Sequence, residues 1–241
     1  MSTKTIRSLL VALGLSALAA APAPLTSADE TAAAFQSIHD KVGPALVTIK
    51  CILKIEGAGD MSNAFGGDEG RELEFSGLMI EPSGLVLTSN TYIGGALSKM
   101  RGLTANASAI KVLIGDDPEG LSAKVLARDS DLDLAWMQID DPKAAGKTFD
   151  YSDLSGSASP AIGDQLLGVT RMGKFFDHAL VINEGRLGGS TKKPRALLIP
   201  TDLAPELGMP VFDKAGKPVG VFILQTPNRE DMEGGDNDGM R

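Results

Sequence analysis

The chain has 241 residues, of which 43% are hydrophobic and 22% are charged, a composition typical of a globular protein with a sizeable core. Its formal net charge of −8 argues against nucleic acid or anionic lipid as a partner, because both attract positive protein surfaces. The 28 glycines and 13 prolines favour many turns and short strands over long helices.

Residues 1–28 have the pattern of a secretory signal peptide. Lys4 and Arg7 precede an uncharged apolar run, residues 8–20, and the small residues of Thr26-Ser27-Ala28 suit a cleavage site. The apolar run is too short to cross a hydrocarbon core of about 30 Å as a helix. We therefore expect export to the periplasm or the exterior, with no membrane span in the mature chain.

A short helix is expected over residues 29–44. Ala33, Phe35, Ile38 and Val42 recur at helical spacing, and Gly43-Pro44 ends the pattern.

From residue 45 onward the pattern changes to short strands separated by Gly, Pro, Asp and Asn. The expected strands cover residues 45–56, 72–80, 85–89, 109–115, 121–128, 132–140, 164–171, 177–187, 195–201, 209–213 and 217–225. A Gly-rich loop is expected at 57–71 and a disordered acidic tail at 227–241. Such spacing indicates an all-β sandwich or barrel.

The single cysteine, Cys51, cannot form an internal disulfide and lies in an apolar run, so we expect a small buried side chain. Trp136 alternates with two leucines on one strand face, which predicts core or barrel packing rather than a platform for a ligand.

Four carboxylates are spaced somewhat as in an EF-hand loop: Asp129, Asp131, Asp133 and Asp140. Leu134 stands where that loop requires glycine, and the last position lacks the bidentate glutamate. No metal and no cofactor is therefore predicted.

Three segments together resemble the HtrA (Deg) branch of the trypsin-like serine proteases. Residues 75–93 (FSGLMIEPSGLVLTSNTYI) are similar to the family's hairpin that ends in Thr-Asn-x-His-Val. Residues 110–139 contain DLDLAWMQI, similar to the strand with the Asp-(Ile/Leu)-Ala-(Leu/Val) motif. Residues 198–224 contain IPTD and GMPVFDKAGKPVGV, similar to the segment around the nucleophile.

The resemblance covers about residues 40–226 and implies a chymotrypsin-like double β-barrel, two packed six-stranded antiparallel barrels with a cleft between them. The first barrel would then span residues 45–142, the linker 143–162 and the second barrel 163–226.

Carried over residue by residue, the resemblance implies an incomplete catalytic triad. Asp133 takes the place of the aspartate that orients the base. Thr91 stands at the histidine position, and a hydroxyl is no general base near neutral pH. Leu207 stands at the serine position and carries no nucleophilic atom.

Two observations do not depend on how the motifs are aligned. The only histidines are His39, before the first strand, and His178, in the second set of strands, whereas the family's base comes from the first barrel. Residues 203–224 contain no Ser, Thr or Cys.

The resemblance also implies an altered oxyanion hole, which depends on backbone N–H groups. Pro205-Glu206 replaces Gly-Asn, and Met209 replaces a glycine.

Several residues around the implied cleft are candidates for contacting a ligand: Phe175, Phe176, His178, Glu206 and Gly208. The plainer interpretation of the two phenylalanines is that one or both rings fill the second barrel. His178 is expected to be a surface or core residue rather than a metal ligand.

The leading hypothesis is an exported pseudoprotease that binds extended peptide or unfolded protein in the cleft, either as a scaffold or as a regulator. The alternatives are a hydrolase with a rearranged site, using Asp133 with Tyr92 or Glu206, and a structural subunit of the cell envelope. The sequence specifies neither the ligand nor the oligomeric state.

Overall fold

The computed structural model describes residues 27–57, 69–95, 103–115, 117–193 and 195–225. Most of the expected signal peptide, most of the Gly-rich loop and the acidic tail lie outside these residues. Within the described ranges, no helix combines the length and the hydropathy that crossing a membrane requires.

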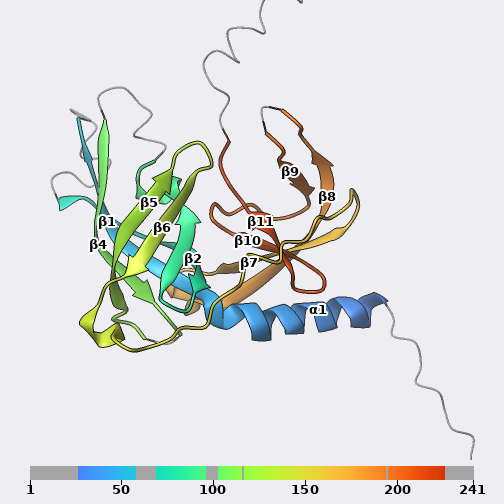
Figure 1. The fold of residues 1–241 in the computed structure, drawn as a ribbon, viewed down its shortest axis with the longest axis horizontal. Coiled ribbons are helices and arrows are strands. Elements are labelled where there is room, and N and C mark those ends of the chain that lie inside the picture. Colours follow the sequence, from blue (N-terminus) through green and yellow to red (C-terminus); the bar gives the residue numbers. More distant parts are fainter. Residues whose placement is uncertain (1–26, 58–68, 96–102, 116, 194, 226–241) are drawn as a thin grey trace, which may run out of the picture.

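The first half of the fold is a closed antiparallel barrel (Figure 1) with strand order β1-β2-β3-β6-β5-β4. Its strands are β1 (Leu46–Glu56), β2 (Arg71–Glu81), β3 (Leu85–Ser89), β4 (Thr104–Leu113), β5 (Leu121–Asp129) and β6 (Leu134–Ile139). The first of the two expected barrels is therefore confirmed.

Alternating burial shows which face of each barrel strand points inward. On β6, Ala135, Met137 and Ile139 are buried, whereas Trp136 lies on the other face and is half-buried. Of the two alternatives predicted for Trp136, packing in the core was therefore wrong, because Ala135, Met137 and Ile139 form the inner face. Cys51 is buried in the core as predicted, and desolvation raises the pKa of its thiol to about 11.

The second half is a curled antiparallel sheet with order β11-β10-β7-β8-β9. Its strands are β7 (Gln165–Arg171), β8 (Leu180–Ser190), β9 (Leu198–Thr201), β10 (Pro210–Asp213) and β11 (Pro218–Val221). The resemblance implied six strands and closure here. Within the described residues the sheet has five strands and is open between β9 and β11.

One hydrophobic core joins the two halves. The cluster that fills the barrel continues into the second sheet through Leu167, Val169 and Phe212. A smaller cluster around Leu166, Leu203 and Met209 lies farther into the second sheet.

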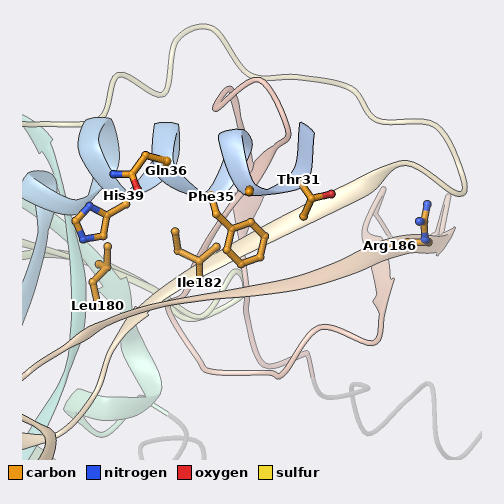
Figure 2. Close-up of a pocket in the computed structure, with 8 residues that line it drawn as sticks. Thr31, Phe35, Gln36, His39, Leu180, Ile182 and Arg186 are labelled. Atoms are coloured by element: carbon orange, nitrogen blue, oxygen red, sulfur yellow. The ribbon is translucent and has the colours of Figure 1, made fainter. Parts of the chain in front are cut away.

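Helix α1 (Ser27–Val42) precedes the barrel and lies along the second sheet (Figure 1). It buries Ala34, Ile38 and Val42, so the inward alanine is Ala34 rather than the predicted Ala33, which is exposed. Figure 2 shows Phe35 facing Ile182 of β8 across a shallow groove.

Arg171, at the end of β7, fixes the junction between the helix and both sheets. Its guanidinium donates to three backbone carbonyls: Leu46 at 2.7 Å, His178 at 3.0 Å and Gly43 at 3.1 Å. This planar fork of donors ties the end of α1, the start of β1 and the β7–β8 connection together.

Candidate functional site

Asp133 lies in the turn between β5 and β6, buried between the two halves of the fold. Its backbone adopts a left-handed conformation (φ 53°), which Asp tolerates better than most residues. Its carbonyl accepts a hydrogen bond of 2.9 Å from the backbone N–H of Asn90, so the turn is anchored to the end of β3.

The Asp133 carboxylate accepts four hydrogen bonds, all from uncharged groups. Oδ1 accepts from the backbone N–H and the hydroxyl of Thr91, both at 2.8 Å. Oδ2 accepts from the Ser89 hydroxyl at 2.7 Å and from the Leu224 N–H at 3.3 Å. A carboxylate offers about four lone-pair sites, so this one has no acceptor capacity left to orient a base.

Thr91 takes the place that the resemblance gave to the catalytic histidine. It lies in a short 3-10 helix, η4 (Asn90–Ile93), whose N-cap Ser89 accepts a hydrogen bond of 3.1 Å from the Thr91 N–H. The Thr91 hydroxyl keeps the hydrogen bond to Asp133 that a histidine ring would make. It has no basic nitrogen, so it cannot take up a proton from a nucleophile.

The loop at the nucleophile position is folded tightly against β3. Gly208 has φ 78°, and a Cβ added there would lie 2.9 Å from the backbone nitrogen of Ser89. The Gly208 N–H donates to the carbonyl of Phe222 at 2.8 Å, so it is already bonded within the protein. Leu207, at the serine position, is half-buried.

Pro205 removes one donor from the position where the family pattern places an oxyanion-binding glycine. Proline has no backbone N–H, so it cannot donate to a developing oxyanion. After Leu207 and Thr91, Pro205 is a third position at which the chain differs from the family pattern.

Glu206 points into the seam between the two sheets. Its Oε1 accepts from the Ser76 hydroxyl of β2 at 3.1 Å, and its Oε2 accepts from the Thr170 hydroxyl of β7. The Ser76 hydroxyl also accepts a hydrogen bond of 3.1 Å from the backbone N–H of Arg171. The carboxylate is therefore a polar link between the two halves.

A cavity of about 200 Å³ opens beside Glu206 in the same seam, lined by residues of both halves: Thr48, Glu74, Phe75, Tyr92, Arg171, Met172, Gly173 and Glu206. The rings of Phe75 and Tyr92 stack with centroids 4.6 Å apart. Burial, and secondarily the negative charges of Glu206 and Asp133, raises the pKa of the Tyr92 phenol, which keeps it protonated.

Phe175 and Phe176 do not fill the second sheet, contrary to the plainer expectation. They are 93% and 54% exposed and meet edge to face, with ring centroids 5.0 Å apart. The turn in which they lie leaves the sheet, so no core position is available to them. The cavity beside Glu206 is lined by Met172 and Gly173 of the same connection instead.

His178 is half-buried rather than exposed. Its Nε2 lies 3.4 Å from the Glu74 carboxylate, and its Nδ1 is buried without a hydrogen-bond partner in the described structure. Among the described residues, no three His, Cys, Asp or Glu side chains converge to form a metal site.

Several residues at the site were missed by sequence reasoning. Ser89, Leu224, Ser76 and Thr170 all donate to the carboxylates of the site. Ser76 and Ser89 both lie in the quoted segment 75–93, but nothing in that segment marks either as a donor to a carboxylate. Ser76 reaches Glu206, and Leu224 reaches Asp133, only because the two halves of the fold dock against each other, for which the linear pattern carries no signal.

Comparison with known proteins identifies the family to which this fold belongs. Residues 75–221 match the family model described as "Trypsin-like peptidase domain". A curated relative, "Probable periplasmic serine endoprotease DegP-like" from Pseudomonas savastanoi pv. phaseolicola (strain 1448A / Race 6), is 33% identical over 166 residues. That match covers 64% of this chain and 30% of the relative, so the chain spans about a third of the relative's length.

Two solved structures share the fold. The structure of Deg5 aligns with a TM-score of 0.55 and 19% identity, covering 83% of this chain and 87% of the other. The HtrA-type protease AlgW with a tripeptide aligns with a TM-score of 0.53 and 18% identity, covering 78% of this chain and 53% of the other. The chain therefore belongs to the trypsin-like peptidase family and is related to its HtrA/Deg branch.

Proposed function

We propose that this chain is an exported HtrA-type pseudoprotease, which holds extended peptide or unfolded protein in the seam between the two halves without cutting it. The observation that carries the proposal is the hydrogen bond of 2.8 Å from the Thr91 hydroxyl to Asp133, which takes the place of the bond from the base to a triad aspartate. The group that Asp133 orients is therefore a hydroxyl with no basic nitrogen.

The size of the expected loss supports this reading. In serine proteases, removal of the serine or the histidine alone lowers kcat by about 10⁶-fold. Here both positions are substituted, and Pro205 removes an oxyanion donor, worth roughly a further 10²–10³-fold in comparable enzymes.

Peptide binding is supported by what the seam retains. The cavity beside Glu206 has an aromatic wall, Phe75 with Tyr92, that suits an apolar side chain. Extended peptides bind by pairing with backbone and placing alternate side chains in such pockets. A periplasmic relative and an HtrA-type structure with a tripeptide support export and peptide as the ligand class.

The alternative of a rearranged hydrolase finds no support in these residues. Tyr92 would have to ionise to act as a nucleophile or base, and its pKa is raised. Glu206 accepts hydrogen bonds from the Ser76 hydroxyl across the seam and from the Thr170 hydroxyl of its own half, so both carboxylate oxygens are already bonded.

The test of lost hydrolysis is an assay of the full chain on unfolded casein, with a fluorophosphonate probe in parallel. The comparison is a triple variant, Thr91→His with Pro205→Gly and Leu207→Ser. We expect the natural chain to show neither cleavage nor labelling, and the triple variant to label. Cleavage or labelling by the natural chain would overturn the proposal.

The test of binding is photo-cross-linking from within the seam. A benzophenone amino acid in place of Leu207 should cross-link unfolded casein. The same variant irradiated without casein should give no adduct. The matched position is Leu126, a leucine that is exposed on β5 of the barrel. Equal cross-linking from the two positions would show that the seam is not the binding site.

A further inference from the structure

An apolar groove runs along the open side of the second sheet, and one end of it, at Ile223 and Gln225, adjoins Leu224, whose N–H donates to Asp133. It encloses about 470 Å³ between β9 and β11, and its lining is mostly aliphatic: Leu166, Thr191, Ala196, Leu197, Leu198, Ile199, Pro200, Val211, Val219, Gly220, Val221, Phe222, Ile223 and Gln225. Two of the lining side chains are large and exposed, Leu198 at 43% and Ile199 at 49%.

The groove is bordered by the outer edges of two terminal strands, β9 and β11. The start of the β11 edge is already occupied, because the Pro218 carbonyl accepts a hydrogen bond of 2.7 Å from the Ala158 N–H. In the described structure β9 pairs only with β8, and β11 pairs only with β10. The barrel in the first half closes with six strands, whereas this sheet stops at five. Exposed apolar edges of this kind are templates for another strand.

We propose that this groove binds an extended segment of a partner protein as an added β-strand. The segment would pair with the edge of β9 or β11 and place aliphatic side chains, at every second position, into the groove. The groove shares no lining residue with the cavity beside Glu206, so either proposal can fail without the other.

The residues that follow the groove along this chain do not have the composition to fill it. Gln225 lines the groove, and residues 226–241 come directly after it. Met232 and Met240 are the only large apolar residues among those sixteen, and seven are charged. Burying such a segment against aliphatic side chains would leave charges without water.

Charge at one end of the groove indicates the partner's chemistry. The β8–β9 connection carries Lys192, Lys193 and Arg195, directly between the lining residues Thr191 and Ala196. Across the described residues, none of these three cations forms an ion pair with an acidic side chain. The partner segment should therefore carry acidic residues next to its alternating aliphatic ones.

The experiment selects binders to the full chain from a random 12-residue phage-displayed peptide library. Selected peptides are then synthesised and their affinities measured by fluorescence polarisation. We expect aliphatic residues at alternate positions with Asp or Glu at one end. Hydrogen exchange should show new protection in β9 and β11 when such a peptide is bound.

Two variants of one residue type locate the site. Ile199→Lys places a charge in the groove and should weaken binding by at least about tenfold, since it removes a buried aliphatic contact. Ile162→Lys, at a position 71% exposed and outside the groove, should not change the affinity. N-methylation of the peptide's pairing amides should abolish binding, because a strand edge requires their hydrogens.

Four results would overturn the proposal: recovery of no binder, binders without alternation, equal affinity for both lysine variants, or no effect of N-methylation. A concentration-dependent dimer that Ile199→Lys dissociates would also overturn it, because the occupant would then be a second copy of this chain.

Discussion

The carboxylate of Asp133 is expected to stabilise the fold, and the sign of its effect tests that role. Removal of a residue that is kept for catalysis often leaves a protein equally or more stable, because active sites hold strained or repelling groups. Removal of a residue kept for structure lowers stability. Asp133→Asn and Asp133→Ala separate these two cases.

The magnitude follows from the four hydrogen bonds. An amide oxygen in the Oδ1 position still accepts from Thr91, and the Ser89 hydroxyl can turn to accept from the new amide. The Leu224 N–H then faces another donor and loses its partner. With the charge also lost, Asp133→Asn should lower the free energy of unfolding by about 2 kcal/mol.

Asp133→Ala leaves every one of these donors without the carboxylate and should cost about 3–5 kcal/mol. The measurement is urea denaturation followed by circular dichroism, with Asp131→Asn as the exposed control on the same turn. If Asp133→Asn is neutral or stabilising while Asp131→Asn is neutral, the structural role assigned to Asp133 is refuted.

Three further predictions rest on single observations. Cys51 has a pKa of about 11, so at pH 8 roughly one thiol in a thousand is ionised. We expect no reaction with a thiol reagent in the native protein, and reaction once the chain is unfolded in urea. Rapid labelling of the native protein would contradict the burial of Cys51. Gly208→Ala should lower the melting temperature by several degrees more than Gly163→Ala. Both glycines have positive φ, but only at Gly208 would an added Cβ crowd neighbouring backbone. Equal shifts in calorimetry would count against the tight loop. Thr170→Val should lower the free energy of unfolding in denaturant by about 1–2 kcal/mol, because Glu206 loses a buried hydrogen-bond donor. An unchanged midpoint would mean that this hydrogen bond contributes nothing to stability.

Much of the fold was accessible from the sequence because strand patterns are local. The alternation of residues 85–89 and the turn before them predict β3 with its observed bounds. The error over Trp136 has a physical reason: both faces of β6 carry apolar residues, so periodicity alone does not show which one is buried.

The candidate site was predictable only in part. Thr91, Asp133 and Leu207 could be assigned because each lies in or beside a quoted motif. The donors that complete the two carboxylate networks, such as Ser76 and Thr170, lie 94 positions apart in the chain. Their proximity depends on the docking of the two halves, and neither residue type predicts that contact.

The substitutions around Asp133 also bear on how such a chain can evolve. A histidine at position 91, a serine at 207 or a glycine at 205 would each, alone, leave the other two positions as they are. If the chain is the pseudoprotease proposed above, hydrolysis would therefore require three coordinated substitutions. The sequence of the seam would then be free to change under other demands, such as shape and affinity.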